Sequence, residues 1–136
     1  MLTAADFEPI VSAVPSFHPK WKELIETFDG RTEVGVEFSF EMTEHLVSRA
    51  AVGDYRDFVL LFAALEVPLS DPTTEIHDSL TMGFLEDLIH SCERKHINLE
   101  RIADCIIGPR LRDEWNWAFN YTHAGKKPYL DDPIKG

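Results

Sequence analysis

The stretch that decides the fold is Glu33–Arg49, with the sequence EVGVEFSFEMTEHLVSR. Steps of four, four and three residues separate its glutamates, Glu33, Glu37, Glu41 and Glu44. Because an α-helix turns once every 3.6 residues, this spacing puts all four carboxylates on one face of a helix. Another face carries a mainly apolar set, Phe38, Met42, His45 and Leu46. We therefore predict a helix over 33–51 whose acidic ridge is held by an apolar stripe.

Nothing inside this stretch neutralises the acidic ridge, since no lysine or arginine occurs between Thr32 and Ser48. Like charges at helical spacing destabilise a helix by about 0.2–0.5 kcal/mol per pair. The alternation in VGVEFSF (34–40) would also suit a strand, but the helical pattern continues more regularly through residue 47. A helix that keeps such a ridge points to a surface used for binding.

Caps and apolar spacing predict further helices on both sides of this one. Thr3 and Asp6 form a partial capping box, while Pro15, Gly30, Gly53 and Pro68 end segments. Asp54, Asn98 and Pro109 suit helix starts. The other predicted helices cover residues 4–14, 19–29, 54–67, 73–95, 99–107 and 109–125. Gly83 interrupts one of them and suggests a close helix crossing. The fold class is all-α: a single-domain irregular bundle of about six to seven helices over 1–125, with a polar tail at 126–136.

The chain of 136 residues is acidic, with a formal net charge of −11. Residues 23–93 hold sixteen acidic and three basic residues (−13), whereas the remainder holds eight and ten (+2). This balance argues against binding nucleic acid through its phosphates and against adhesion to an anionic membrane. It favours fast, salt-sensitive association with a basic partner, although solubility alone would also account for an acidic chain.

The two cysteines, Cys92 and Cys105, lie in apolar helical contexts and do not suggest a disulfide framework. The first residues, MLTAADFEPIV, lack a basic region followed by a long apolar run, so we expect no signal peptide. The longest apolar run, Phe58–Leu65, is too short to span a bilayer. We expect buried free thiols and a cytoplasmic protein.

The segments GDYRDFVLLFAALE (53–66), FLEDL (84–88) and IIGPRLRDEW (106–115) resemble a family of small α-helical bacterial proteins. Members of that family occur as candidate immunity proteins of polymorphic toxin systems. The resemblance covers about 35 to 65 residues and rests on core helical positions. It implies a protein that binds and blocks a cognate toxin, but it supplies no binding residues.

Carboxylates and histidines also occur at metal-ligand spacing. Glu41 and His45 stand four residues apart, Asp87 and His90 stand three apart, and Glu86 and His90 stand four apart. Di-iron helical bundles use Glu-x-x-His pairs on facing helices, and none of these three pairs has that form; His-Glu-x-x-His is absent from the sequence. The sequence also has no Gly-x-Ser-x-Gly elbow and no phosphate-binding Gly-rich loop. We expect no metal, no cofactor and no enzymatic activity.

Aromatic residues are dense near the C-terminus, where they suit core packing. The alternative is that Trp117 or Tyr121 is exposed and anchors an interface, because Trp and Tyr dominate binding hot spots. Arg110 and Arg112, at the start of the last helix, could pair with the acidic ridge.

Together, these patterns predict an immunity protein that binds a basic toxin and occludes its active or substrate-binding site with carboxylates. The predicted contact residues are the ridge, Glu33, Glu37, Glu41 and Glu44, and a second acidic rim, Asp54, Asp57, Asp71, Glu75 and Asp78. Three alternatives stay open: a small metal-dependent enzyme, a homo-oligomeric scaffold and a module that binds a small ligand in its core.

Overall fold

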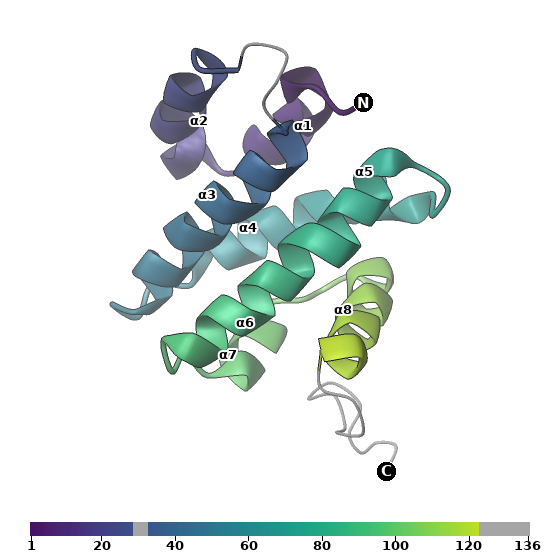
Figure 1. The fold of residues 1–136 in the computed structure, drawn as a ribbon. Coiled ribbons are helices and arrows are strands. Elements are labelled where there is room, and N and C mark those ends of the chain that lie inside the picture. The colour runs from purple at the N-terminus through teal and green to yellow at the C-terminus, as the bar shows by residue number, and fades with distance from the viewer. Residues whose placement is uncertain (29–32, 123–136) are drawn as a thin grey trace.

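The computed structural model describes residues 1–28 and 33–122, and these residues form helices and turns with no strand. The predicted all-α fold is confirmed (Figure 1). In chain order the elements are α1 (Ala4–Val11), η1 (Pro15–Phe17), α2 (His18–Ile25), α3 (Val34–Ala50), α4 (Arg56–Leu65), η2 (Pro68–Ser70), α5 (Glu75–Asp78), η3 (Ser79–Leu85), α6 (Glu86–Arg94), α7 (Leu99–Ala103) and α8 (Pro109–Thr122). The predicted tail, 126–136, lies outside the described residues.

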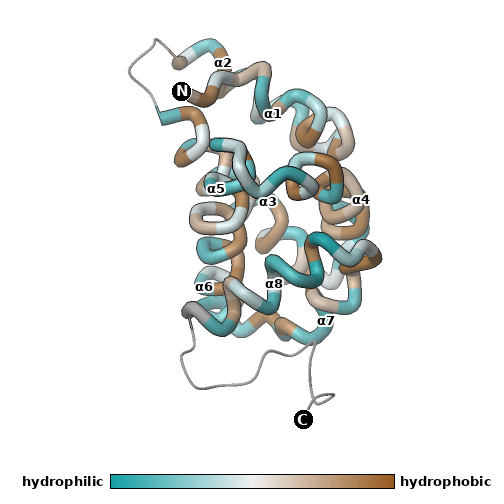
Figure 2. Tube along the Cα trace, turned by 90° about the vertical axis from the view of Figure 1, so that its right-hand side faces the viewer, coloured by the Kyte–Doolittle hydropathy of each residue, from teal (hydrophilic) through white to brown (hydrophobic). Residues whose placement is uncertain are grey.

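The α3 helix matches its prediction within a residue at each end, and its apolar face reaches the centre of the core. Phe38 is fully buried. Its ring stacks on Phe7 of α1 at 4.6 Å and meets Trp21 of α2 at 6.1 Å and Phe84 of η3 at 5.6 Å. Helices from both halves of the chain therefore pack around one side chain of α3. Figure 2 shows hydrophobic and hydrophilic residues alternating along the helices, as expected where each helix buries one face.

The predicted helix 73–95 is present as α5, η3 and α6, which follow one another as one continuous rod (Figure 1). Its middle segment, η3, is a π-helix rather than an α-helix. A π segment inside an α-helix widens one turn, and such segments occur frequently at functional sites. The rod runs alongside α3, so two long helices form one face of the molecule (Figure 1).

Small residues allow α3 and η3 to approach closely. A Cβ atom on Gly35 would lie 2.6 Å from the Ser79 hydroxyl oxygen, and one on Gly83 would lie 3.3 Å from that of Ser39. Each glycine thus faces a serine of the other helix. The close approach predicted from Gly83 is confirmed, although the two helices run side by side there rather than crossing (Figure 1).

Helix α4 spans Arg56–Leu65 and is shorter than the predicted 54–67, and three further predicted helices also end early. The first ends at Val11 because the next amides, of Ala13 and Val14, bond three residues back and lead into η1. The second ends at Ile25, and α7 ends at Ala103 where Cys105 donates to the Ile102 carbonyl at 2.9 Å. Hydrogen bonds to the third residue back tighten a helix end. Such ends depend on local geometry that apolar spacing does not encode.

The start of α8 is fixed by an acid from a distant part of the chain. The Glu66 carboxylate accepts hydrogen bonds from the backbone N–H of Arg110 at 3.1 Å and of Leu111 at 2.8 Å. A carboxylate at this position satisfies free N–H groups and complements the helix dipole. The Arg110 guanidinium donates to the Ser70 carbonyl at 3.2 Å. The expectation that Arg110 pairs with the acidic ridge is therefore wrong: its partner lies in η2.

Candidate interaction surface

The structure divides the four glutamates of the predicted ridge into two pairs. Glu33, the N-cap residue of α3, and Glu44 are exposed, whereas Glu37 and Glu41 are half-buried. Lys20 of α2 places its Nζ atom 3.7 Å from the Glu41 carboxylate. The ammonium group of Lys20 therefore partly neutralises the ridge from another helix. The exposed part of the ridge is its two ends, Glu33 and Glu44.

Asp57, predicted for the second acidic rim, is turned into the protein and is only 9% exposed. Its Oδ2 atom lies 2.5 Å from the Ser16 hydroxyl, 3.1 Å from Nε2 of His45 and 3.1 Å from Nε of Arg49. These contacts join η1, α3 and α4. Asp57 is therefore a structural residue, and we leave it out of the surface that could meet a partner.

Asp54 is likewise engaged within the chain. The Arg56 guanidinium donates to its two carboxylate oxygens at 3.0 and 2.8 Å, and the Arg56 N–H donates at 3.1 Å. These bonds hold the pKa of Asp54 well below its usual range. The carboxylate thus carries its charge next to a cation, which weakens its field at a partner. We also leave Asp54 out of the contact surface.

Ser16, His45 and Asp57 are the residue types of a serine-hydrolase triad, but their arrangement differs. A triad places the serine on one ring nitrogen of histidine and the aspartate on the other. Here both Ser16 and Asp57 lie against the same atom, Nε2 of His45, at 2.9 and 3.1 Å. Histidine cannot relay a proton between them through that arrangement. We interpret the cluster as a polar joint between helices.

The remaining rim residues lie along the start of the rod. Asp71 accepts bonds from the Thr73 N–H and hydroxyl at 3.0 and 2.6 Å, which lowers its pKa. Glu75 lies 3.2 Å from the N-terminal amine. Asp78 is exposed on the next turn. Glu75 and Asp78 lie near Glu33, whereas Asp71 belongs to the loop before α5.

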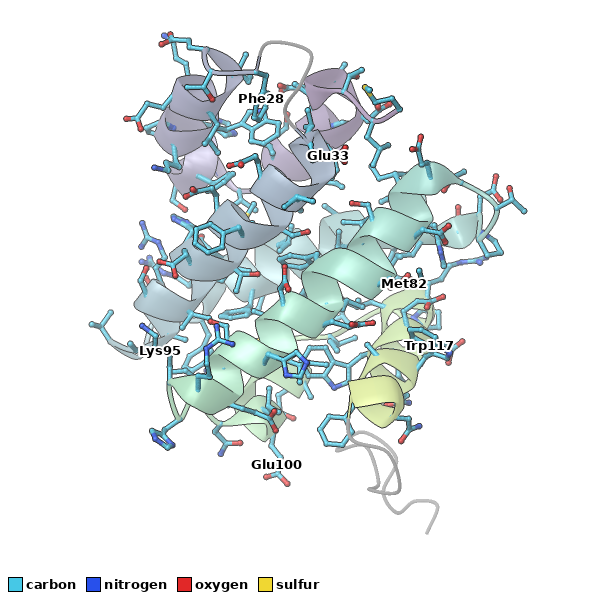
Figure 3. The ribbon with its side chains drawn as sticks, viewed as in Figure 1. Phe28, Glu33, Met82, Lys95, Glu100 and Trp117 are labelled. Atoms are coloured by element: carbon cyan, nitrogen blue, oxygen red, sulfur yellow. The ribbon has the colours of Figure 1, made fainter. Side chains whose placement is uncertain are left out.

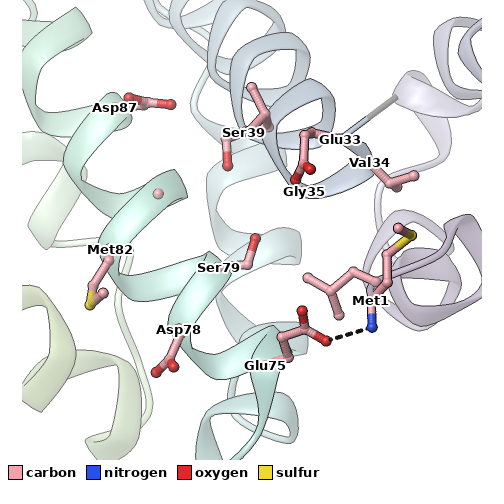
Figure 4. Close-up of a pocket in the computed structure, with 13 residues that line it drawn as sticks. Met1, Glu33, Val34, Gly35, Ser39, Glu75, Asp78, Ser79, Met82 and Asp87 are labelled. Atoms are coloured by element: carbon pink, nitrogen blue, oxygen red, sulfur yellow. Dashed lines mark ion pairs between the residues drawn. The ribbon is translucent and has the colours of Figure 1, made fainter. Parts of the chain in front are cut away.

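A groove runs between α3 and the rod and brings these carboxylates together (Figure 4). It has a volume of about 680 Å³. Glu33, Ser39 and Ser79 project into the space between the helices, while Glu75 and Asp78 lie at its end (Figure 4). Helical spacing in the sequence does not predict this groove, because only the parallel packing of α3 and the rod creates it.

The groove leads to a smaller pocket of about 200 Å³ further along the two helices. Asp87 lines both hollows. Burial raises the pKa of this carboxyl group. Val36 and Phe40, one turn apart on α3, border the two hollows and are 62% and 58% exposed. We call the groove, the pocket and their border the acidic groove, defined by Glu33, Val36, Phe40, Glu44, Glu75, Asp78 and Asp87.

Three members of the acidic groove were missed as site residues from the sequence. Val36 and Phe40 fit an apolar helix pattern, and their exposure becomes visible only once the neighbouring helices are placed. Asp87 was considered only as half of a ligand pair with His90. A usable signal existed for Phe40, because it falls outside the stripe of Phe38, Met42 and Leu46.

Both cysteines are buried free thiols, as predicted. Burial raises the pKa of the Cys92 thiol to about 12 and also raises that of Cys105. A raised pKa keeps a thiol protonated at neutral pH, and the thiolate is the nucleophile. Neither residue has the environment of a reactive cysteine.

We expect Cys92 and Cys105 to resist iodoacetamide at pH 8 in the folded protein, because both are buried and protonated. In denaturant both should react within minutes. Mass spectrometry after timed quenching measures the two rates. Reaction of either cysteine at the same rate with and without denaturant would contradict this burial.

The pairs at metal-ligand spacing in the sequence are not joined by a third ligand among the described residues. Within residues 1–28 and 33–122, no group of three or more His, Cys, Asp or Glu side chains could hold a metal ion. His45 instead contacts Ser16 and Asp57. In the same part of the chain, no helix combines the length and apolarity needed to cross a membrane.

Comparison with known proteins finds no relative of this chain. No family model, no curated protein and no solved structure matches the chain. The acidic groove is therefore the feature that bears on function.

Proposed function

We propose that this protein binds a basic protein partner through the acidic groove and thereby neutralises it, as an immunity protein neutralises its toxin. The observation that carries the proposal is the joining of acidic and exposed apolar side chains on one face. Glu33, Glu44 and Asp87 stand around Val36 and Phe40. Carboxylates alone would serve solubility, but exposed apolar groups beside them favour a contact surface.

Charge supports a basic partner. The segment 23–93, which contains every residue of the groove from Glu33 to Asp87, carries a formal charge of −13. A field of one sign steers an oppositely charged protein and raises its association rate, and salt weakens this effect. The apolar residues would then bury against the partner and slow its dissociation.

Occlusion is the mechanism that follows for a partner acting on an anionic substrate. Such a toxin needs a basic site for phosphates or other anions. Carboxylates such as Glu33 and Glu44 can occupy that site in place of the substrate, because they carry the same charge. Their removal from the groove should therefore abolish neutralisation and binding together.

A capture experiment with tagged protein in lysate of the source cell tests this function. Wild type should retain one basic protein at low salt and less of it at high salt. The double variant E33K/E44K should lose that protein, because two attractive contacts become repulsive. Mass spectrometry identifies the retained protein and compares its amount between variants.

The matched control is E100K/D104K, which changes the net charge by the same amount. Glu100 and Asp104 are exposed at α7, and Figure 3 places Glu100 at the opposite end of the molecule from Glu33. The control should keep the partner. Equal loss in both variants would show that only overall charge matters, and equal retention would contradict a role for the acidic groove.

A further inference from the structure

The smaller pocket of the acidic groove has features that a general acidic surface does not require. Its volume of about 200 Å³ falls below the range of about 300–1,000 Å³ typical of small-molecule sites. It therefore suits a single side chain better than a whole ligand. The pocket is lined by residues that include Phe40, Thr43, Glu44, Asp87, His90 and Arg94.

Thr43 gives the pocket a polar atom that lacks a partner. The residue is 5% exposed, and its hydroxyl oxygen is buried with no hydrogen-bond partner among the described residues. A buried hydroxyl is usually bonded, and one that is not calls for an explanation. Because Thr43 lines the pocket, a rotation of its side chain about χ1 would turn this oxygen toward an entering donor.

The charges around the pocket favour a cation. Glu44 comes from α3 and Asp87 from the rod, so the two carboxylates flank the pocket from both helices. Asp87 is exposed, and desolvation of its carboxyl group raises its pKa more than nearby His90 and Arg94 lower it. Arg94 is the one arginine or lysine among the pocket-lining residues, and it is exposed.

We propose that this pocket receives the guanidinium group of an arginine side chain from the partner. The inference rests on the proposed function and names the anchor of the contact. A guanidinium is planar, so it can stack on the exposed Phe40 ring while its N–H groups reach Glu44 and Asp87. Once the Thr43 side chain rotates toward the pocket, its oxygen can accept a further N–H. A lysine ammonium offers neither the plane nor the fork of donors.

The test uses the full chain and N-acetyl-arginine amide as the probe. In ¹H–¹⁵N NMR spectra, the probe should cause saturable shifts at residues 40–44 and 87–91. N-acetyl-citrulline amide has nearly the same shape without the charge, and it should cause none. Absence of saturable shifts with the arginine probe, or equal shifts with both probes, would overturn the proposal.

Variants locate the binding to the pocket. E44Q and D87N should each raise the dissociation constant about two- to fivefold, the range expected for a partly exposed ion pair. T43V keeps the side-chain shape and should also raise it. R94Q should lower it, because a competing cation is removed. Weaker binding in R94Q would overturn the proposal, since the pocket would then hold an anionic or carbonyl group.

The probe requires no partner, so the two proposals can fail separately. Probe binding without any captured protein would leave the pocket standing and contradict the proposed function. Conversely, capture of a partner that E44Q, D87N and T43V bind unchanged would support the function and contradict the arginine anchor.

Discussion

Replacing Phe38 with alanine should lower the free energy of unfolding by about 3–5 kcal/mol, the usual cost of a large-to-small change at a buried aromatic residue. Phe38 is fully buried and contacts rings from α1, α2 and η3. Removing it would leave a cavity where the two halves of the chain meet. Equilibrium unfolding in urea, followed by far-UV circular dichroism, measures the change.

Phe40→Ala is the matched control, because the same change falls on the same helix two residues later. Phe40 is 58% exposed, so its loss should change the free energy of unfolding by only about 0.5 kcal/mol. Equal effects of the two substitutions would mean that α3 does not bury the face described above.

Replacing Asp57 with alanine should lower the free energy of unfolding by about 3 kcal/mol, at the lower end of the range for breaking a buried ion pair. The lower end applies because Arg49 is partly exposed. The substitution would leave Arg49 and His45 without the carboxylate between them. Thermal and urea unfolding both report the loss.

Asp104→Ala provides the comparison for Asp57, since Asp104 is exposed. Its removal should change stability by about 0.5 kcal/mol or less. If Asp57→Ala also stayed within that range, the polar joint of η1, α3 and α4 would not contribute to stability.

The fold was predictable where the signals are local. Apolar residues at helical spacing, continued without a proline through residue 47, predicted both ends of α3 to within one residue. Asp54, which was predicted to cap α4, lies one residue before its N-cap, Tyr55, and its side chain accepts the N–H of Arg56, the first residue of the helix. Pro109 is the first residue of α8. Each of these signals depends on neighbours in the sequence alone.

The features that could not be predicted depend on contacts between distant segments. Glu66 caps a helix that begins more than forty residues later, and Lys20 reaches Glu41 from another helix. Asp57 is engaged by Ser16 of η1 and by His45 and Arg49 of α3, all from other elements. Helical spacing shows which residues share a face, but it does not show what covers that face.

The candidate site, like the fold, was predictable only in part, because helical spacing does not show which residues neighbouring helices cover. Four of the predicted acidic residues are exposed in the acidic groove: Glu33, Glu44, Glu75 and Asp78. The other two glutamates of the ridge, Glu37 and Glu41, are half-buried. The carboxylate of Asp54 is bound by the Arg56 guanidinium. Asp87 joined the site only because the rod packs beside α3. The acidic character was predictable, but its arrangement around exposed Val36 and Phe40 was not.

Two exposed aromatic residues offer the most direct test of where a partner binds. Phe40 lies in the acidic groove, while Trp117, 46% exposed, lies on α8 (Figure 3). The decisive measurement is the dissociation constant of the captured partner for F40A and for W117A, by biolayer interferometry. We expect F40A to weaken binding about tenfold or more, as for a hot-spot residue, and W117A to leave it within about twofold. Weaker binding in W117A with no change in F40A would place the interface on α8 and contradict binding at the acidic groove.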